Sequence, residues 1–124
     1  MHWNEIGRDS LRAARAIQDS NARSSISRAY YAAHSVLTEA LLNAGYVPPR
    51  ARQTPPHMLQ PALIGQFLNG KGERVVRELR VTVRRLYAAR LDADYNRRVT
   101  IDSGVSLQAV RDAHAMFLML EVNP

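Results

Sequence analysis

The sequence contains no cysteine among its 124 residues. This absence excludes disulfides, thiolate metal sites and cysteine nucleophiles, and nothing marks an oxidising compartment, so we expect a cytoplasmic protein. No stretch approaches the roughly 20 apolar residues that a membrane-spanning helix needs. The N-terminal segment alternates polar and apolar residues and lacks the unbroken apolar core of a signal peptide. We therefore expect a soluble chain with no membrane partner.

Motifs of several enzyme classes are also missing. No histidines and carboxylates share a metal-ligand spacing, and neither a phosphate-binding glycine-rich loop nor a serine nucleophile elbow occurs. Metal hydrolases and nucleoside triphosphatases are therefore disfavoured. We expect no metal and no cofactor.

The basic charge of the chain comes almost entirely from arginine. The net charge is +6, and Lys71 is the single lysine. Such a balance favours polyanionic partners such as RNA or DNA, and the guanidinium group suits bidentate phosphate contacts. Genome base composition produces the same arginine bias, so charge alone leaves nucleic-acid binding open.

Hydrophobic periodicity predicts an all-α fold. Hydrophobic residues make up 46% of the chain, enough for one core, so residues 1–124 are expected to form a single domain. No segment alternates with period two. We expect an up-and-down bundle of four long helices and one short helix, covering residues 3–19, 22–44, 57–69, 73–95 and 106–122.

Local signals predict the helix ends. Gly45 is placed as the residue that follows the second helix, and four prolines between residues 46 and 56 predict a loop. Ser106 is expected to cap the last helix, with Val105 and Val110 packed as a hydrophobic staple. Two further stripes are expected to be buried, one of Trp3, Ile6, Ala13, Ala14 and Ile17, the other of Leu107, Val110, Phe117 and Leu118.

The second helix has an apolar stripe and, opposite it, an unusual polar flank. The stripe should face the core and comprises Ile26, Ala29, Ala33, Leu37 and Ala40, flanked by Tyr30 and Val36. The polar flank lacks the lysines and glutamates of a solvated face, which indicates a packed surface. It comprises Ser24, Ser27, Arg28, Tyr31, His34, Ser35 and Thr38.

Arg28 and His34 are the leading functional candidates on the polar flank. They are six residues apart, which separates them by about 9 Å along the helix axis, too far for one tight site. Two antiparallel copies would bring both pairs into one cleft, because an isologous interface repeats each residue on both sides. We therefore expect a homodimer formed through the polar flank.

The helix over 73–95 carries charges in two unusual places. Its apolar stripe continues onto Arg90 and Asp94, whose i, i+4 spacing permits an ion pair. That pair is either purely structural or positions Tyr31 or Arg28 from behind. On another side of the helix lie Arg77, Arg80 and Arg84, with Arg74 and Arg85 at the margin, and this cluster is either solvated or contacts an RNA backbone.

Two further histidines are interpreted separately. His114 lies within the apolar stripe of the last helix and is expected in the core. His57 follows two prolines and is expected to cap the next helix or to line the cleft proposed for the homodimer, with RNA contact as its functional interpretation.

Two segments carry a family resemblance. S-R-A-Y-Y-A-A-H at 27–34 and R-L-D-A-D-Y at 90–95 resemble the small stand-alone HEPN domain proteins of prokaryotes. The hallmark of that family is an arginine followed by a histidine on a long helix, matched here by Arg28 and His34 with five residues between. The order of the other elements also matches, so the resemblance spans nearly the whole chain.

The resemblance implies a metal-independent endoribonuclease, usually a homodimer and often the toxin of a toxin–antitoxin pair or a defence protein. In that reaction the RNA 2′-hydroxyl attacks the adjacent phosphate. His34 would transfer protons and Arg28 would stabilise the developing charge. Supporting roles would fall to Ser27, Tyr31, Arg90 and Asp94, although Tyr31 is equally well explained as an interface residue.

A second interpretation stays open. Family members often carry a polar residue directly after the motif arginine, where this chain has Ala29. A noncatalytic HEPN interaction module, or an accessory subunit of a partner nucleotidyltransferase, is the alternative to the ribonuclease.

Overall fold

The computed structural model describes residues 2–124, and over that range every regular element is a helix. Two short 3-10 helices, η1 (His57–Leu59) and η2 (Asn69–Lys71), flank the shortest α-helix. The first and the last α-helix end earlier than expected, at Ala16 and Met119 respectively. The predicted class, all-α with four long helices and one shorter helix, is confirmed. The α-helices are α1 (Trp3–Ala16), α2 (Ala22–Asn43), α3 (Gln60–Phe67), α4 (Glu73–Tyr95) and α5 (Ser103–Met119).

The ends of α2 follow the expected local rules. Asn21 caps the N-terminus through its side-chain oxygen. At the other end Gly45 adopts a φ of 101°, and its N–H donates to the carbonyl of Leu42 (3.1 Å). The N–H of Tyr46 donates to the carbonyl of Leu41 (2.9 Å), which completes a Schellman motif. The predicted role of Gly45 is confirmed.

The predicted start of α5 is wrong. Asp102 is the capping residue, and its carboxylate accepts a hydrogen bond from the Val105 N–H (3.1 Å). Ser106 lies inside the helix, where its hydroxyl donates to the Gln18 carbonyl (2.8 Å) and ties α5 to the turn after α1. Val105 is 40% exposed and lies within the helix, so the expected hydrophobic staple with Val110 is also wrong.

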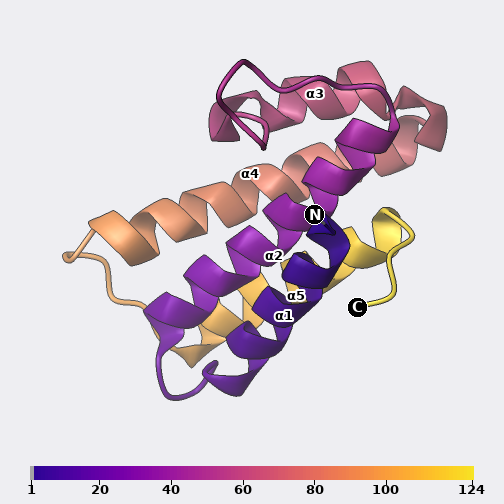
Figure 1. Cartoon of the computed structure of the whole chain (residues 1–124). Coiled ribbons are helices and arrows are strands. Elements are labelled where there is room, and N and C mark those ends of the chain that lie inside the picture. The colour runs from indigo at the N-terminus through magenta and orange to yellow at the C-terminus, as the bar shows by residue number, and fades with distance from the viewer. Residues whose placement is uncertain (1) are drawn as a thin grey trace.

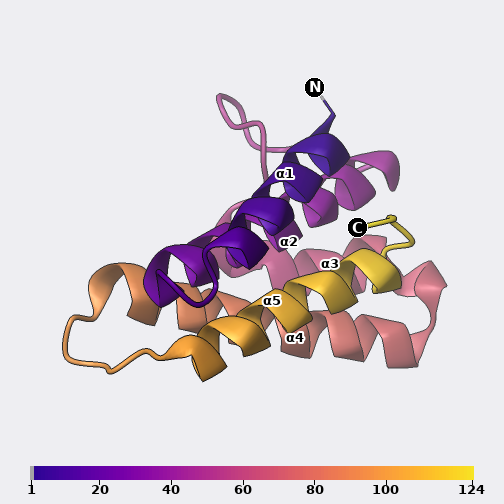
Figure 2. The same cartoon turned by 90° about the horizontal axis from the view of Figure 1, so that it is seen from below.

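The central helix of the bundle is α2. It packs against α1, α4 and α5, and α5 also packs against α4 (Figures 1 and 2). The shorter α3 packs mainly on α4. The chain end returns to α1, where Arg8 donates to the carbonyl of Asn123 (2.7 Å). Within residues 2–124, no helix is long and apolar enough to cross a membrane.

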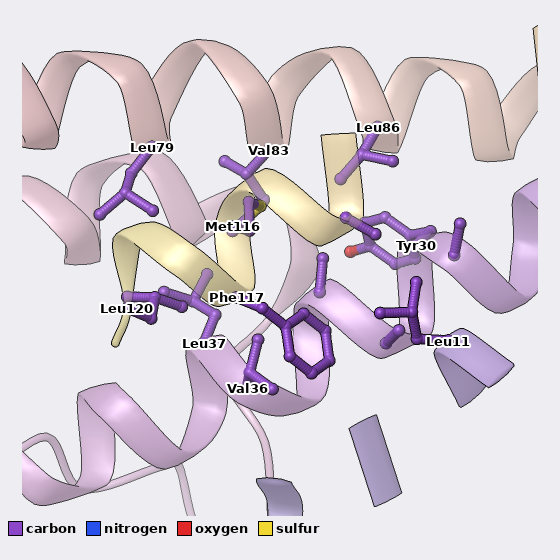
Figure 3. Close-up of a cluster of buried hydrophobic side chains, with 14 of the residues drawn as sticks. Leu11, Tyr30, Val36, Leu37, Leu79, Val83, Leu86, Met116, Phe117 and Leu120 are labelled. Carbon is purple, nitrogen blue, oxygen red and sulfur yellow. The ribbon is translucent and has the colours of Figure 1, made fainter. Parts of the chain in front are cut away.

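The apolar stripe of α2 forms the centre of the core (Figure 3). Every residue predicted for this stripe is buried except Ala40, which is partly exposed. The neighbouring helices contribute Leu79, Val83, Leu86, Met116 and Phe117. Leu118 is 58% exposed, so its predicted burial is wrong.

The buried face of α1 differs from the one expected. Ala14 is buried as expected, but Ile6 is 37% exposed, and Gly7 and Leu11, which were not predicted, are buried. A Cβ placed on Gly7 would lie 2.8 Å from Cγ1 of Val36 and 3.1 Å from the Ala32 carbonyl oxygen. The lack of a side chain at this position allows α1 to approach α2 closely.

Replacing Gly7 by alanine should therefore lower the free energy of unfolding by roughly 1–2 kcal/mol, because overpacking outweighs the gain in helix propensity. Gly65→Ala is the matched control. Its Cβ would meet only Arg80 at an ordinary 3.6 Å. Urea denaturation should show that this second change is neutral or stabilising, and equal losses in the two variants would contradict the close-approach argument.

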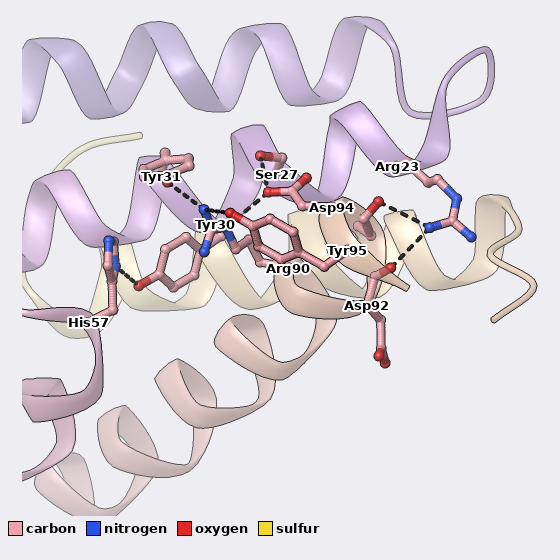
Figure 4. A network of polar contacts seen from close by, with 10 residues as sticks. Arg23, Ser27, Tyr30, Tyr31, His57, Arg90, Asp92, Asp94 and Tyr95 are labelled. Carbon is pink, nitrogen blue, oxygen red and sulfur yellow. Dashed lines mark hydrogen bonds and ion pairs between the residues drawn. The ribbon is translucent and has the colours of Figure 1, made fainter. Parts of the chain in front are cut away.

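Arg23 on α2 holds the end of α4 (Figure 4). Its guanidinium donates to the carbonyls of Asp92 (2.9 Å), Ala93 (3.0 Å), Asn96 (3.1 Å) and Val99 (2.5 Å). The Asp92 carbonyl also accepts the backbone N–H of Asn96 (3.1 Å), and the cation complements the helix dipole at this C-terminus. This side chain fixes α4 against α2 next to the Arg90 region.

Candidate functional site

Aromatic and polar side chains gather where α2, α4 and the segment that begins α3 meet. The α2 residues lie one turn or less apart, and the segment from η1 into α3 crosses them. We call this group the histidine cluster, and it comprises Tyr30, Tyr31, His34, His57, Gln60, Tyr87 and Arg90.

Gln60 is fully buried and connects both histidines of the cluster. Its side-chain nitrogen donates to the hydroxyl of Tyr30 (2.7 Å) and to the backbone carbonyl of His57 (3.0 Å), and its oxygen contacts Nδ1 of His34 (2.9 Å). A backbone carbonyl only accepts, which fixes the orientation of the amide. His34 must therefore carry its proton on Nδ1, so neutral His34 has a free lone pair on Nε2.

Tyr30 links Gln60 to His57 through its hydroxyl (Figure 4). The Tyr30 hydroxyl lies 2.5 Å from Nδ1 of His57, and burial raises the pKa of this tyrosine, so the hydroxyl keeps its proton. Among residues 2–124, Nδ1 of His57 is the one acceptor in contact with this hydroxyl, because Gln60 is a donor to it, so the hydroxyl donates to His57. Neutral His57 therefore carries its proton on Nε2. These hydrogen bonds give the two histidines opposite tautomers, and the centroids of their rings lie only 4.7 Å apart.

Burial keeps both imidazoles uncharged at neutral pH. His34 is 5% exposed, and burial lowers its pKa to about 4, with the nearby His57 and Arg90 acting in the same direction. His57 is partly exposed, and its pKa is lowered by burial and by the charges of Arg90 and Arg52. His57 is therefore the more accessible of the pair.

The predicted pair of Arg90 and Asp94 is confirmed. Nε of Arg90 lies 3.0 Å from the Asp94 carboxylate, and the two side chains are 12% and 27% exposed. Arg90 also donates to the Tyr31 hydroxyl (2.9 Å), as one of the two sequence interpretations expected. The hydroxyl of Ser27 donates to Asp94 (3.3 Å). The ion pair therefore connects α4 to two members of the polar flank.

Three tyrosine rings surround the Arg90 guanidinium. Its central carbon lies 5.9 Å from the ring centroid of Tyr30, 5.4 Å from that of Tyr31 and 5.3 Å from that of Tyr95. At these distances the rings attract a cation. A fixed positive charge therefore lies beside the two neutral histidines.

The structure corrects the expectation that the whole polar flank is free to meet a second copy. His34, Ser35 and Thr38 are buried inside their own chain, because the segment that begins α3 places Gln60 over this end of the flank. Ser24, Ser27 and Tyr31 remain partly exposed. Arg28 is exposed, and no other residue within 2–124 gives its guanidinium a hydrogen bond or ion pair. The chain does not bring Arg28 and His34 together by itself.

His57 also lines a pocket of about 270 Å³ beside the cluster. The rings of His57 and Tyr87 stack at a centroid distance of 5.9 Å and an angle of 5°. This pocket lies within one chain, and the role of His57 at the cleft between two copies stays a prediction. The pocket is lined by His57, Met58, Gln60, Pro61, Val83, Arg84, Tyr87, Ala88 and Leu91.

The arginine cluster of α4 lines a second hollow of about 470 Å³. Arg77, Arg80 and Arg84 share this side of the helix, as expected. Arg85 instead forms a two-bond ion pair with Asp112 (2.7 and 2.8 Å), which ties α4 to α5. The remaining lining residues are Glu73, Val76 and Val81.

The prediction that His114 is a core residue is wrong. It is partly exposed, and its Nδ1 accepts a hydrogen bond from Arg15 (2.6 Å). The buried face of α5 at this point consists of Ala113, Met116 and Phe117, and His114 lies beside that face, next to a cation. His114 lies outside the histidine cluster.

Comparison with known proteins assigns no family: no family model, curated protein or solved structure matches the chain. In the part of the chain that the structure describes, no group of three or more histidine, aspartate or glutamate side chains is placed to hold a metal ion. The geometry of the histidine cluster therefore carries the functional argument.

Proposed function

We propose that the chain is a metal-independent endoribonuclease of the HEPN type, an up-and-down bundle acting in the cytoplasm as a toxin or defence protein. The observation that supports this proposal is the pair of neighbouring imidazoles with opposite tautomers. His34 presents a free lone pair on Nε2, and His57 presents an N–H on Nε2. One is a proton acceptor and the other a hydrogen-bond donor, within a single cluster that also holds a cation.

The cleavage step uses these complementary groups. Nε2 of His34 takes the proton of the RNA 2′-hydroxyl, whose oxygen then attacks the adjacent phosphorus. The bond from phosphorus to the 5′-oxygen breaks, and His34 returns the proton to that oxygen. His57 donates its N–H to a phosphate oxygen, while Arg90 supplies positive charge nearby.

The low pKa of His34 fits this role once RNA is bound. Burial disfavours its charged form in the free protein. A phosphate placed beside the imidazole favours the charged form and raises the pKa toward neutrality. The proton acceptor would thus be strengthened by the substrate itself.

Arg28 enters this scheme through a second copy of the chain. The exposed end of the polar flank, which includes Arg28, Ser24 and Ser27, is the surface available for an isologous contact. In such a homodimer the Arg28 guanidinium of one protomer would reach the histidine cluster of the other and contact the phosphate. Tyr31 would lie at this contact and orient the phosphate or His34.

Alanine variants test the assignment. His34→Ala and Arg28→Ala should each reduce RNA cleavage in the presence of a metal chelator by about 100-fold, the lower range for loss of acid–base or charge-stabilising groups. His114→Ala is the control, because His114 lies outside the cluster. The assay should detect 2′,3′-cyclic phosphate ends, and light scattering should confirm an unchanged dimer. Wild-type protein that cleaves no RNA would refute the enzymatic proposal.

A noncatalytic interaction module is the second candidate, and the 5% exposure of His34 favours it. In that case the protein binds RNA or a partner without cleavage, and both alanine variants bind as the wild type does. Co-purification with a nucleotidyltransferase would identify an accessory subunit, whereas a partner that inhibits RNA cleavage would identify an antitoxin and favour the first candidate.

A further inference from the structure

Two hollows lie side by side along one side of α4. Arg84 lines both the apolar pocket next to His57 and the arginine-lined hollow, so the two adjoin at this residue. From Arg77 to Leu91 this side extends about 21 Å at 1.5 Å per residue. We call this surface the α4 groove, and its α4 residues recur at intervals of one to three: Glu73, Val76, Arg77, Arg80, Val81, Val83, Arg84, Tyr87, Ala88 and Leu91.

One half of the α4 groove is complementary to a phosphate backbone. It holds three guanidinium groups and the single carboxylate of Glu73. Nε of Arg80 is buried and has no hydrogen-bond partner within residues 2–124. The other nearby arginine, Arg85, is engaged by Asp112 and does not contribute. The positive charge in this half is therefore available to an anionic ligand.

The other half is an apolar pocket with aromatic walls. Its volume of about 270 Å³ lies just below the roughly 300 Å³ at which small-molecule sites begin, which suits one planar ring system. His57, Arg84 and the Tyr87 hydroxyl are the groups that offer polar contacts there, because the Gln60 amide is already engaged inside the histidine cluster. The other lining residues are apolar. Flat aromatic walls with few polar groups are typical of sites that hold an unstacked base.

We propose that single-stranded RNA lies along the α4 groove, with its phosphates on Arg77, Arg80 and Arg84 and one base in the pocket beside His57 and Tyr87. A base can enter such a pocket only after leaving the helical stack, so a single strand is required. This inference rests on the proposed function, because the phosphate next to the held base would lie at the histidine cluster.

The first experiment measures binding without cleavage. Fluorescence anisotropy with a 2′-O-methyl oligonucleotide compares the wild type with Arg77→Gln/Arg84→Gln. The variant should bind about tenfold more weakly, and its log–log salt dependence should be shallower by about 1.4, since each phosphate contact to a single strand contributes about 0.7. The control Arg12→Gln/Arg111→Gln removes the same charge from exposed sites on α1 and α5.

The second experiment tests the base pocket. Ala88→Phe fills the pocket from an exposed helical position, and an abasic nucleotide removes the base from the ligand. Each change alone should weaken binding about tenfold, the effect of losing one stacked base. Together they should weaken it no further, because both remove the same contact.

The outcomes separate this inference from the proposed function. If both groove variants bind RNA as tightly as the wild type while His34→Ala abolishes cleavage, the α4 groove is not the RNA path and the ribonuclease stands. If the groove variants lose binding but the wild type cleaves nothing, the path stands and the enzyme does not. Loss of dimerisation in the groove variants without loss of RNA binding overturns the inference, because the surface then belongs to a second copy.

Discussion

Replacing Arg23 by methionine should lower the free energy of unfolding by about 3 kcal/mol. The guanidinium group donates to four carbonyls at the end of α4 and in the segment that follows. Hydrogen bonds from charged donors contribute about 1.5–3 kcal/mol each, but four bonds that share one group are not additive. Part of the loss is recovered when water reaches the released carbonyls.

Arg111→Met is the matched control, because Arg111 lies on a helix, is exposed and belongs neither to the histidine cluster nor to the polar flank. Its substitution should change stability by no more than about 0.5 kcal/mol. Both variants are compared by urea denaturation, and hydrogen exchange should show lost protection at the C-terminal end of α4 in the Arg23 variant alone. Equal stability of the two variants would show that Arg23 does not hold the helix end.

Acidification should destabilise the protein by about 3 kcal/mol through His34 alone. The folded-state pKa of about 4 lies below the ordinary value of 6.5. Between these values the unfolded chain binds a proton that the folded chain does not, so stability rises with pH across this window. The contribution is complete above pH 6.5 and is lost as the pH falls to about 4. At ~1.4 kcal/mol per pKa unit, the difference amounts to about 3 kcal/mol.

Carboxylates titrate in the same window, so the measurement compares wild type with His34→Asn. Asparagine keeps a donor for Gln60 but does not titrate. The groups that face His34 with charge, His57 and Arg90, are present in both proteins. The free energy of unfolding of the wild type, measured relative to that of His34→Asn, should fall by about 3 kcal/mol from pH 7 to pH 4. A difference independent of pH would mean that His34 is not held neutral by burial.

Local sequence signals predicted most of the fold. Periodicity placed the long helices, and Gly45 and the prolines after it marked the end of α2 and the loop. Ser106 and Asp102 are both good capping residues, and the choice between them depends on the contact of Ser106 with Gln18, which lies far away in the sequence. Gly7 gave no signal, because its role comes from the approach of another helix.

The candidate site was predictable only where its contacts are local. The pair of Arg90 and Asp94 follows from i, i+4 spacing. The hydrogen bonds that join His34, Gln60 and Tyr30 depend on where the proline-rich loop places the next helix. No sequence pattern within α2 predicts that position. The burial of His34 was therefore missed, and so was the role of Gln60.

Tyr30 belongs to the interior and to the histidine cluster at once. Its ring is packed among the buried aliphatic side chains, whereas its hydroxyl joins Gln60 to His57 (Figures 3 and 4). Replacing Tyr30 by phenylalanine would preserve the volume of the ring but remove the hydroxyl that connects the two imidazoles. Replacing it by a smaller polar residue would leave a void in the core. One side chain therefore serves both the packing of the core and the hydrogen bonds that join the two imidazoles, and no other standard side chain supplies both.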